Sequence, residues 1–92
     1  MKIILNNNEN ELIKEYKDAF NLDELTSLAT DYFNDFDYIL GDYAYNKLRL
    51  KGFFNDDNKK ATDINKYSYV DEYINKYCAY ECRYFILKKK KQ

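Results

Sequence analysis

The residues best suited by type and spacing to bind a partner lie in one stretch, Asp37–Phe54. Every second residue in its later part is aromatic or cationic: Tyr43, Tyr45, Lys47, Arg49, Lys51 and Phe53. Leu48 and Leu50 lie between the cations, and alternation with a period of two is typical of a β-strand with one apolar face. We therefore expect a hairpin of two strands that presents aromatic rings and positive charges on one face.

Two classes of partner fit a surface of rings and cations. Single-stranded RNA is held by bases that stack on aromatic rings and by phosphates that meet Lys and Arg, and Lys51-Gly52-Phe53 resembles the opening of the RNA-recognition-motif signature. The acidic residues that follow, Asp56 and Asp57, depart from that signature. Protein interfaces also favour Tyr and Arg. A protein partner is our first expectation, because a net charge of −1 lacks the basic excess typical of nucleic-acid-binding domains.

The candidate contact residues form one set on this stretch: Asp42, which we expect to shape the turn, with Tyr43, Tyr45, Lys47, Arg49 and Lys51. A purely structural interpretation of the same residues is also open, because Lys and Arg on an edge strand protect it against aggregation. The two interpretations differ in whether the side chains are occupied by contacts within the fold.

The two cysteines, Cys78 and Cys82, are four positions apart. A tetrahedral zinc site needs two further thiolates or imidazoles, and the chain has no other cysteine and no histidine, so we expect no metal site. A reversible disulfide of a redox sensor is one alternative. The simpler expectation is that the thiols are small buried apolar groups.

The inventory of reactive residues argues against catalysis. Without histidine, the chain lacks the usual general base near neutral pH and every Ser-His or Cys-His nucleophile arrangement. Its two glycines, Gly41 and Gly52, are too few for a phosphate-binding or dinucleotide-binding loop. We therefore predict a non-enzyme with no catalytic residue and no cofactor.

Length and composition predict one globular domain spanning residues 1–92. Hydrophobic residues make up 46% of the chain and charged residues 34%, a balance typical of folded domains. No apolar run reaches the length of a membrane span, and polar residues from Asn6 onward interrupt the first apolar segment too early for a signal peptide. We expect a cytoplasmic protein without a membrane partner.

The apolar periodicity predicts seven elements in the order β-β-α-β-β-α-β. They are strands at Lys2–Leu5 and Glu11–Tyr16, a helix at Leu22–Phe36 with Asn21 as N-cap, the hairpin Asp37–Phe54, a helix from Ser68 to Cys78, and a strand at Arg83–Leu87. Apart from the first strand, this is the ferredoxin-like order. We expect an α+β fold with a mostly antiparallel sheet, an extra N-terminal strand and both helices on one sheet face.

Several segments resemble the YutD family, small proteins of low-GC Gram-positive bacteria and their relatives. The matching segments are Tyr16–Asn21, Asp37–Phe54, Lys60–Thr62, and Tyr77-Cys78 through Cys82 to Tyr84–Leu87. The chain departs from the family pattern at Tyr43-Ala44, where we expect Trp-Gly, and at Glu81, where we expect Gly. The resemblance implies an α+β domain and a bacterial host, and it assigns no biochemical role.

Together, the residues and the resemblance predict a non-catalytic binding or adaptor domain. We expect it to contact a protein partner through the aromatic and basic face of the 37–54 hairpin. RNA binding through the same face and a thiol-based redox role for Cys78 and Cys82 remain the alternatives.

Overall fold

The computed structural model describes residues 2–77 and 82–90. These residues contain five strands, two α-helices and two short 3₁₀-helices. The strands are β1 (Lys2–Leu5), β2 (Asn8–Tyr16), β3 (Tyr38–Ala44), β4 (Lys47–Phe53) and β5 (Tyr84–Lys89). The helices are α1 (Leu22–Leu28), η1 (Asp31–Asp35), η2 (Tyr67–Tyr69) and α2 (Val70–Tyr77). The predicted α+β class and the order of strands and helices are confirmed.

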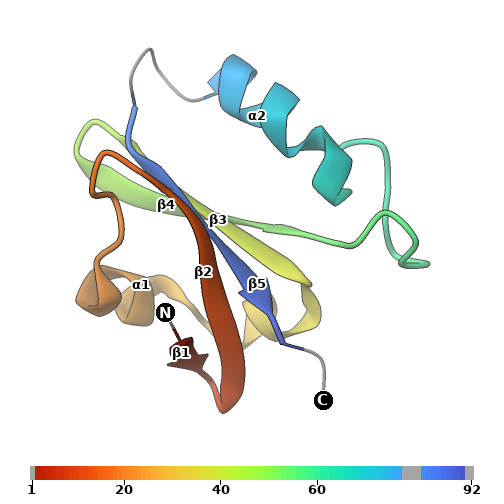
Figure 1. Ribbon diagram of the computed structural model, residues 1–92, viewed down its shortest axis with the longest axis horizontal. Helices are drawn as coiled ribbons and strands as arrows, with labels where there is room; N and C mark the ends of the chain where they lie inside the picture. The colour runs from red at the N-terminus through yellow and green to blue at the C-terminus, as the bar shows by residue number, and fades with distance from the viewer. Residues whose placement is uncertain (1, 78–81, 91–92) are drawn as a thin grey trace.

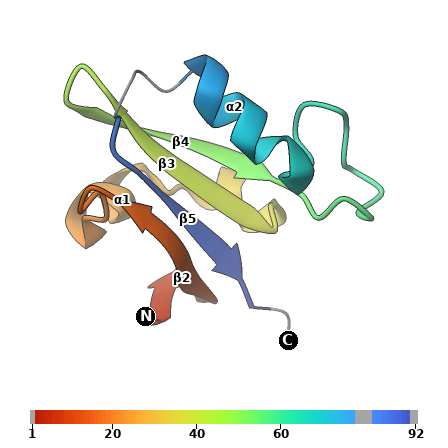
Figure 2. The same ribbon diagram turned by 45° about the horizontal axis from the view of Figure 1, so that its top comes forward.

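The five strands form one sheet in the order β1-β2-β5-β3-β4, with every neighbouring pair antiparallel. The two α-helices lie on opposite sides of this sheet (Figures 1 and 2). On one side, Leu25 of α1 is buried with Ile39 and Phe85. On the other side, Val70 of α2 is buried with Leu40. Because successive side chains of a strand point to opposite faces, the central strands β3 and β5 have both faces covered.

The predicted placement of both helices on one face was therefore wrong, and the ferredoxin-like core is not confirmed. β5 lies between β2 and β3 in the sheet, and the helices are divided between its faces. The physical reason is the composition of the central strands. β3 is buried at six successive positions and β5 at three, and a strand that is apolar on both faces needs a covering layer on each side.

The first helix is shorter than predicted. It begins as expected, because the Asn21 side-chain oxygen accepts a hydrogen bond from the Glu24 backbone N–H at 3.0 Å. It ends after Leu28, where the Asn6 side-chain amide donates to the carbonyl of Ala29 at 3.3 Å. The chain then turns into η1 rather than extending α1, and Phe36, directly after η1, packs on Gly52 of β4.

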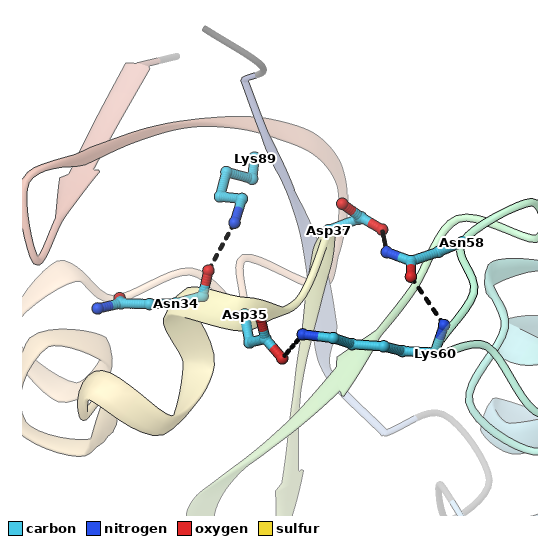
Figure 3. Close-up of polar contacts among 6 residues, drawn as sticks. All are labelled: Asn34, Asp35, Asp37, Asn58, Lys60 and Lys89. Carbon is cyan, nitrogen blue, oxygen red and sulfur yellow. Dashed lines mark hydrogen bonds and ion pairs between the residues drawn. The ribbon is translucent and has the colours of Figure 1, made fainter.

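Carboxylates near the start of β3 anchor the long segment that follows β4 (Figure 3). Asp37 accepts hydrogen bonds from the backbone N–H of Asn55 at 2.8 Å and from the side-chain amide of Asn58 at 3.0 Å. The Lys60 ammonium lies 2.6 Å from an Asp35 oxygen. The acidic side chains therefore hold the loop in place. The described part of the chain holds no cluster of three potential metal ligands.

Each of the two glycines allows an aromatic ring to pack directly on the backbone of its strand. A Cβ atom on Gly41 would lie 2.3 Å from Cζ of Phe85, and one on Gly52 would lie 2.2 Å from Cγ of Phe36. Neither glycine has a positive φ, so the requirement is for space and not for an unusual backbone conformation. The rings fill the place of the missing side chains, an arrangement that stabilises glycine within strands.

We predict that Gly41→Ala lowers the free energy of unfolding by about 1–3 kcal/mol, because the added methyl group overpacks the contact with Phe85. The measurement is urea unfolding followed by circular dichroism. In a Phe85→Leu background the same substitution should cost much less, because the smaller side chain leaves room. An equal cost in both backgrounds would show that the ring does not set the requirement for glycine.

Candidate contact surface on the β3–β4 hairpin

A two-residue turn sets the register of the hairpin. Tyr45 and Asn46 have φ values of 53° and 63°, and a type I′ turn requires positive φ at both central positions. Ala44 pairs with Lys47, and Tyr43 pairs with Leu48. An odd-numbered residue before the turn therefore shares a face with an even-numbered residue after it.

The predicted row is consequently divided between the two faces. Lys47, Arg49 and Lys51 do share one face, because they pair with alternate residues of β3. Tyr43 lies on the other face, with Leu48. The prediction that Tyr43 joins the cations was wrong, because alternation was counted through the turn as if the strand were continuous.

Tyr43 is part of the core beside α1. Its side chain is buried, and its hydroxyl donates a hydrogen bond to the Glu24 carboxylate at 3.1 Å. The guanidinium carbon of Arg83 lies 4.0 Å from the centre of its ring. Burial, together with the hydrogen bond to Glu24, raises the pKa of Tyr43. Neither contact could be predicted from spacing, since Glu24 and Arg83 are distant in sequence.

Asp42 is buried in the middle of β3 and does not shape the turn as predicted. Arg49, directly opposite on β4, donates to both of its carboxylate oxygens, from Nε at 3.1 Å and from Nη2 at 2.7 Å. This two-bond geometry is the strongest form of an Arg–carboxylate pair, and the hydrogen bond to Asp42 raises the pKa of Arg49. Nη2 also donates to the carbonyl of Tyr77 at 3.2 Å, which ties α2 to the hairpin. Arg49 is therefore occupied within the fold.

Besides Arg49, whose side chain is 45% exposed in spite of its pairing, three of the six candidate residues lie at the surface. Tyr45 is 98% exposed at the tip of the hairpin, and Lys47 is exposed beside it. Lys51 is half-buried, with its ammonium 5.2 Å from the centre of the Phe53 ring and 5.6 Å from that of Tyr73. Neither lysine has an ion-pair partner within residues 2–77 and 82–90.

A hollow of about 340 Å³ opens beside β4, and no pattern of residues indicates it. Four segments line it: Tyr32, Phe33 and Phe36 around η1, Leu50, Lys51 and Gly52 of β4, Asn65 of the loop, and Tyr73 of α2. The apolar spacing predicts a continuous helix through the aromatic residues around η1, so it does not indicate their approach to the edge of the sheet.

The cysteine prediction is not tested. Cys78 lies outside the described residues. Cys82 is half-buried just before β5. The alternatives of a buried pair and a redox pair therefore stay predictions.

Comparison with known proteins identifies the family. The sequence model of the YutD-like family, described as "Putative antitoxin YutD-like", matches residues 4–88. The chain belongs to this family. It is 48% identical over 87 residues to the protein named "Putative antitoxin YutD" of Bacillus subtilis (strain 168), across 95% of this chain and 96% of that protein. The resemblance seen in the sequence is confirmed.

A solved member of the family has the same fold. The solution NMR structure of protein yutD from B. subtilis is similar to the whole chain with a TM-score of 0.84 and 46% sequence identity, and the match covers 84% of that chain. The family is named for an antitoxin and not for a class of enzyme. None of the described helices has the length and apolar character that a membrane span requires.

We predict that Arg49→Ala lowers the free energy of unfolding by about 3 kcal/mol. The side chain of Asp42 is only 4% exposed, and removal of its partner leaves a buried, unpaired carboxylate. Adding Asp42→Ala should recover part of the loss, because the unpaired charge is then gone. A double-mutant cycle in urea tests this, and additive losses would show that the two side chains do not act as a pair.

Proposed function

We propose that this chain is a non-catalytic cytoplasmic binding domain, and that the exposed tip of its β3–β4 hairpin contacts a protein partner. The name of the family supports a protein partner, since an antitoxin acts against a toxin. The contact residues that we assign are Tyr45 and Lys47, with Lys51 at the edge of the surface. Arg49, Asp42 and Tyr43 hold the hairpin in shape and are not assigned to the contact.

The observation that carries this proposal is the position of Tyr45. Its φ of 53° lies in the left-handed region, which costs roughly 1–2 kcal/mol for a residue with a side chain. Gly, Asn and Asp are the usual residues of such turns. With 98% of its surface exposed, the Tyr45 ring makes no packing contact that offsets this cost. Tyr is also one of the residues that dominate binding energy at protein interfaces.

The RNA alternative is weaker with this geometry. It depended on a continuous row of rings and cations on one face, and the register places Tyr43 on the opposite face. Arg49 is paired with Asp42, so one ring and two lysines remain. These residues fit a small protein contact better than the extended stacking platform that holds single-stranded RNA.

We predict that Tyr45→Gly separates stability from binding. It should raise the free energy of unfolding by about 1 kcal/mol, because glycine adopts a positive φ without strain. It should also lower capture of the partner by about tenfold or more, the effect typical of an interface hot spot. The measurements are urea unfolding and quantitative affinity capture from a bacterial lysate treated with nuclease, followed by reconstitution of the complex from two purified proteins.

Asn46→Gly is the matched control. It changes the same turn and relieves the same type of strain, but it keeps the Tyr45 ring, so partner capture should stay at the level of the original chain. If Tyr45→Gly and Asn46→Gly capture the partner equally, the hairpin tip is not the contact. If capture disappears when nuclease is added, the binding depends on nucleic acid and the protein-partner proposal is wrong.

A further inference from the structure

The outer edge of β4 is an unpaired strand edge. β4 is the last strand of the sheet on its side and pairs only with β3 among the described strands. Among the residues that the structure describes, the chain returns to this edge at one place, where the backbone of Phe54 forms an isolated parallel bridge with Lys66. The seven residues of β4 before that point have no neighbouring strand on the outer side, whereas the edge strand β1 at the opposite end has four residues. Long edges of this kind are able to accept a further strand.

The hydrogen bonds of Phe54 show which N–H and C=O groups of β4 point away from β3. The Phe54 N–H donates to the carbonyl of Asn65 and its carbonyl accepts from the N–H of Tyr67, each at 2.8 Å, so both groups point away from β3. In an antiparallel pair this direction alternates along the strand. The N–H and C=O groups of Gly52, Leu50 and Leu48 therefore also point outward.

The two sides of this edge differ in chemistry. On the side of α2, the cations of β4 follow one another at every second residue. On the side of η1, Leu50, Phe36 and Tyr32 contribute apolar and aromatic surface to the hollow of about 340 Å³, whose lining also includes the polar groups of Lys51, Asn65 and Tyr73. Tyr32 is 68% exposed, with its ring 5.3 Å from that of Phe36. A strand added here would place alternate side chains against cations and against apolar rings.

We propose that the outer edge of β4 binds an extended segment of the protein partner as an added strand, in which acidic side chains facing Lys47 and Lys51 alternate with apolar side chains facing Leu50 and Tyr32. The proposal rests on the proposed function and specifies how the partner is held. Backbone hydrogen bonds to Leu48, Leu50 and Gly52 supply the pairing, and the alternating side chains supply the selectivity.

Charge selects this occupant over a second copy of the chain. If two β4 edges paired with each other, the basic rows of both copies would meet, and like charges directly opposite on neighbouring strands are destabilising. Protection against aggregation alone needs the cations, but it does not need an open hollow lined by aromatic rings along the same edge. A strand in which acidic and apolar side chains alternate complements the cations on one side of the edge and the rings on the other.

The test uses two synthetic nine-residue peptides with the isotopically labelled chain. In one peptide glutamate and valine alternate, and in the control lysine and valine alternate. We expect the glutamate peptide to bind at low ionic strength, to slow amide hydrogen exchange at Leu48, Leu50 and Gly52, and to bind more weakly as salt is added. The lysine peptide should bind at least tenfold more weakly.

Two substitutions examine the backbone and the charge separately. Leu50→Pro removes an outward N–H without removing a hydrogen bond to β3, as prolines on edge strands do, and it should abolish peptide binding. Lys47→Glu should weaken binding by about tenfold, since a cross-strand attraction becomes a repulsion. Lys59→Glu makes the same charge change at an exposed site on the loop and should leave binding unchanged. The charge variants keep the test valid if Leu50→Pro does not fold.

The outcomes separate this inference from the proposed function. No binding at millimolar peptide, equal binding of both peptides, or slowed exchange elsewhere than at Leu48, Leu50 and Gly52 would overturn it. Slowed exchange at these amides that depends on protein concentration without peptide would indicate pairing of two copies and would also overturn it. Loss of partner capture in Tyr45→Gly without peptide binding at the edge leaves the hairpin-tip contact standing. If the peptide binds at the edge but Tyr45→Gly leaves partner capture unchanged, only the hairpin-tip contact is overturned.

Discussion

The register of the β3–β4 hairpin is the constraint on which the rest of the structure depends. With two residues in the turn, Asp42 lies opposite Arg49 and Gly41 opposite Leu50. A shift of one residue would exchange the faces of every side chain on β4. The carboxylate of Asp42 would then lose its contact with Arg49. A residue with a side chain would take the place of Gly52 against the ring of Phe36. One turn therefore fixes the ion pair, the ring contact and the direction of the basic row together.

Much of the fold could be predicted because its elements carry local signals. The cap of α1 at Asn21 and the alternation in β4 involve residues close in sequence. The distribution of helices between the faces has no such signal. It follows from the burial of both faces of β3 and β5, and a short apolar run looks the same in a strand covered on one side or on two.

The arrangement of the candidate residues was predicted in part, and the missing part has two physical origins. Alternation identified the basic row correctly within β4, but spacing alone does not state how many residues the turn uses. That number decided the side on which Tyr43 lies. The pairing of Arg49 with Asp42 and the contact of Tyr43 with Glu24 join separate elements, so type and position alone could not show which polar residues were already occupied.

The residues that make contacts within the fold also explain how Tyr45 and the two lysines are held at the surface. Arg49 joins β3 and α2 to β4, and Phe36 packs on Gly52 from the other face, so β4 is held extended from both sides. A binding surface that is fixed before the partner arrives loses less conformational freedom on association. The residues lost from the predicted contact set thus keep their importance in another form. They hold the edge of β4 and the strained tip at Tyr45 in a single geometry, and a partner strand needs such a geometry in order to pair in one register.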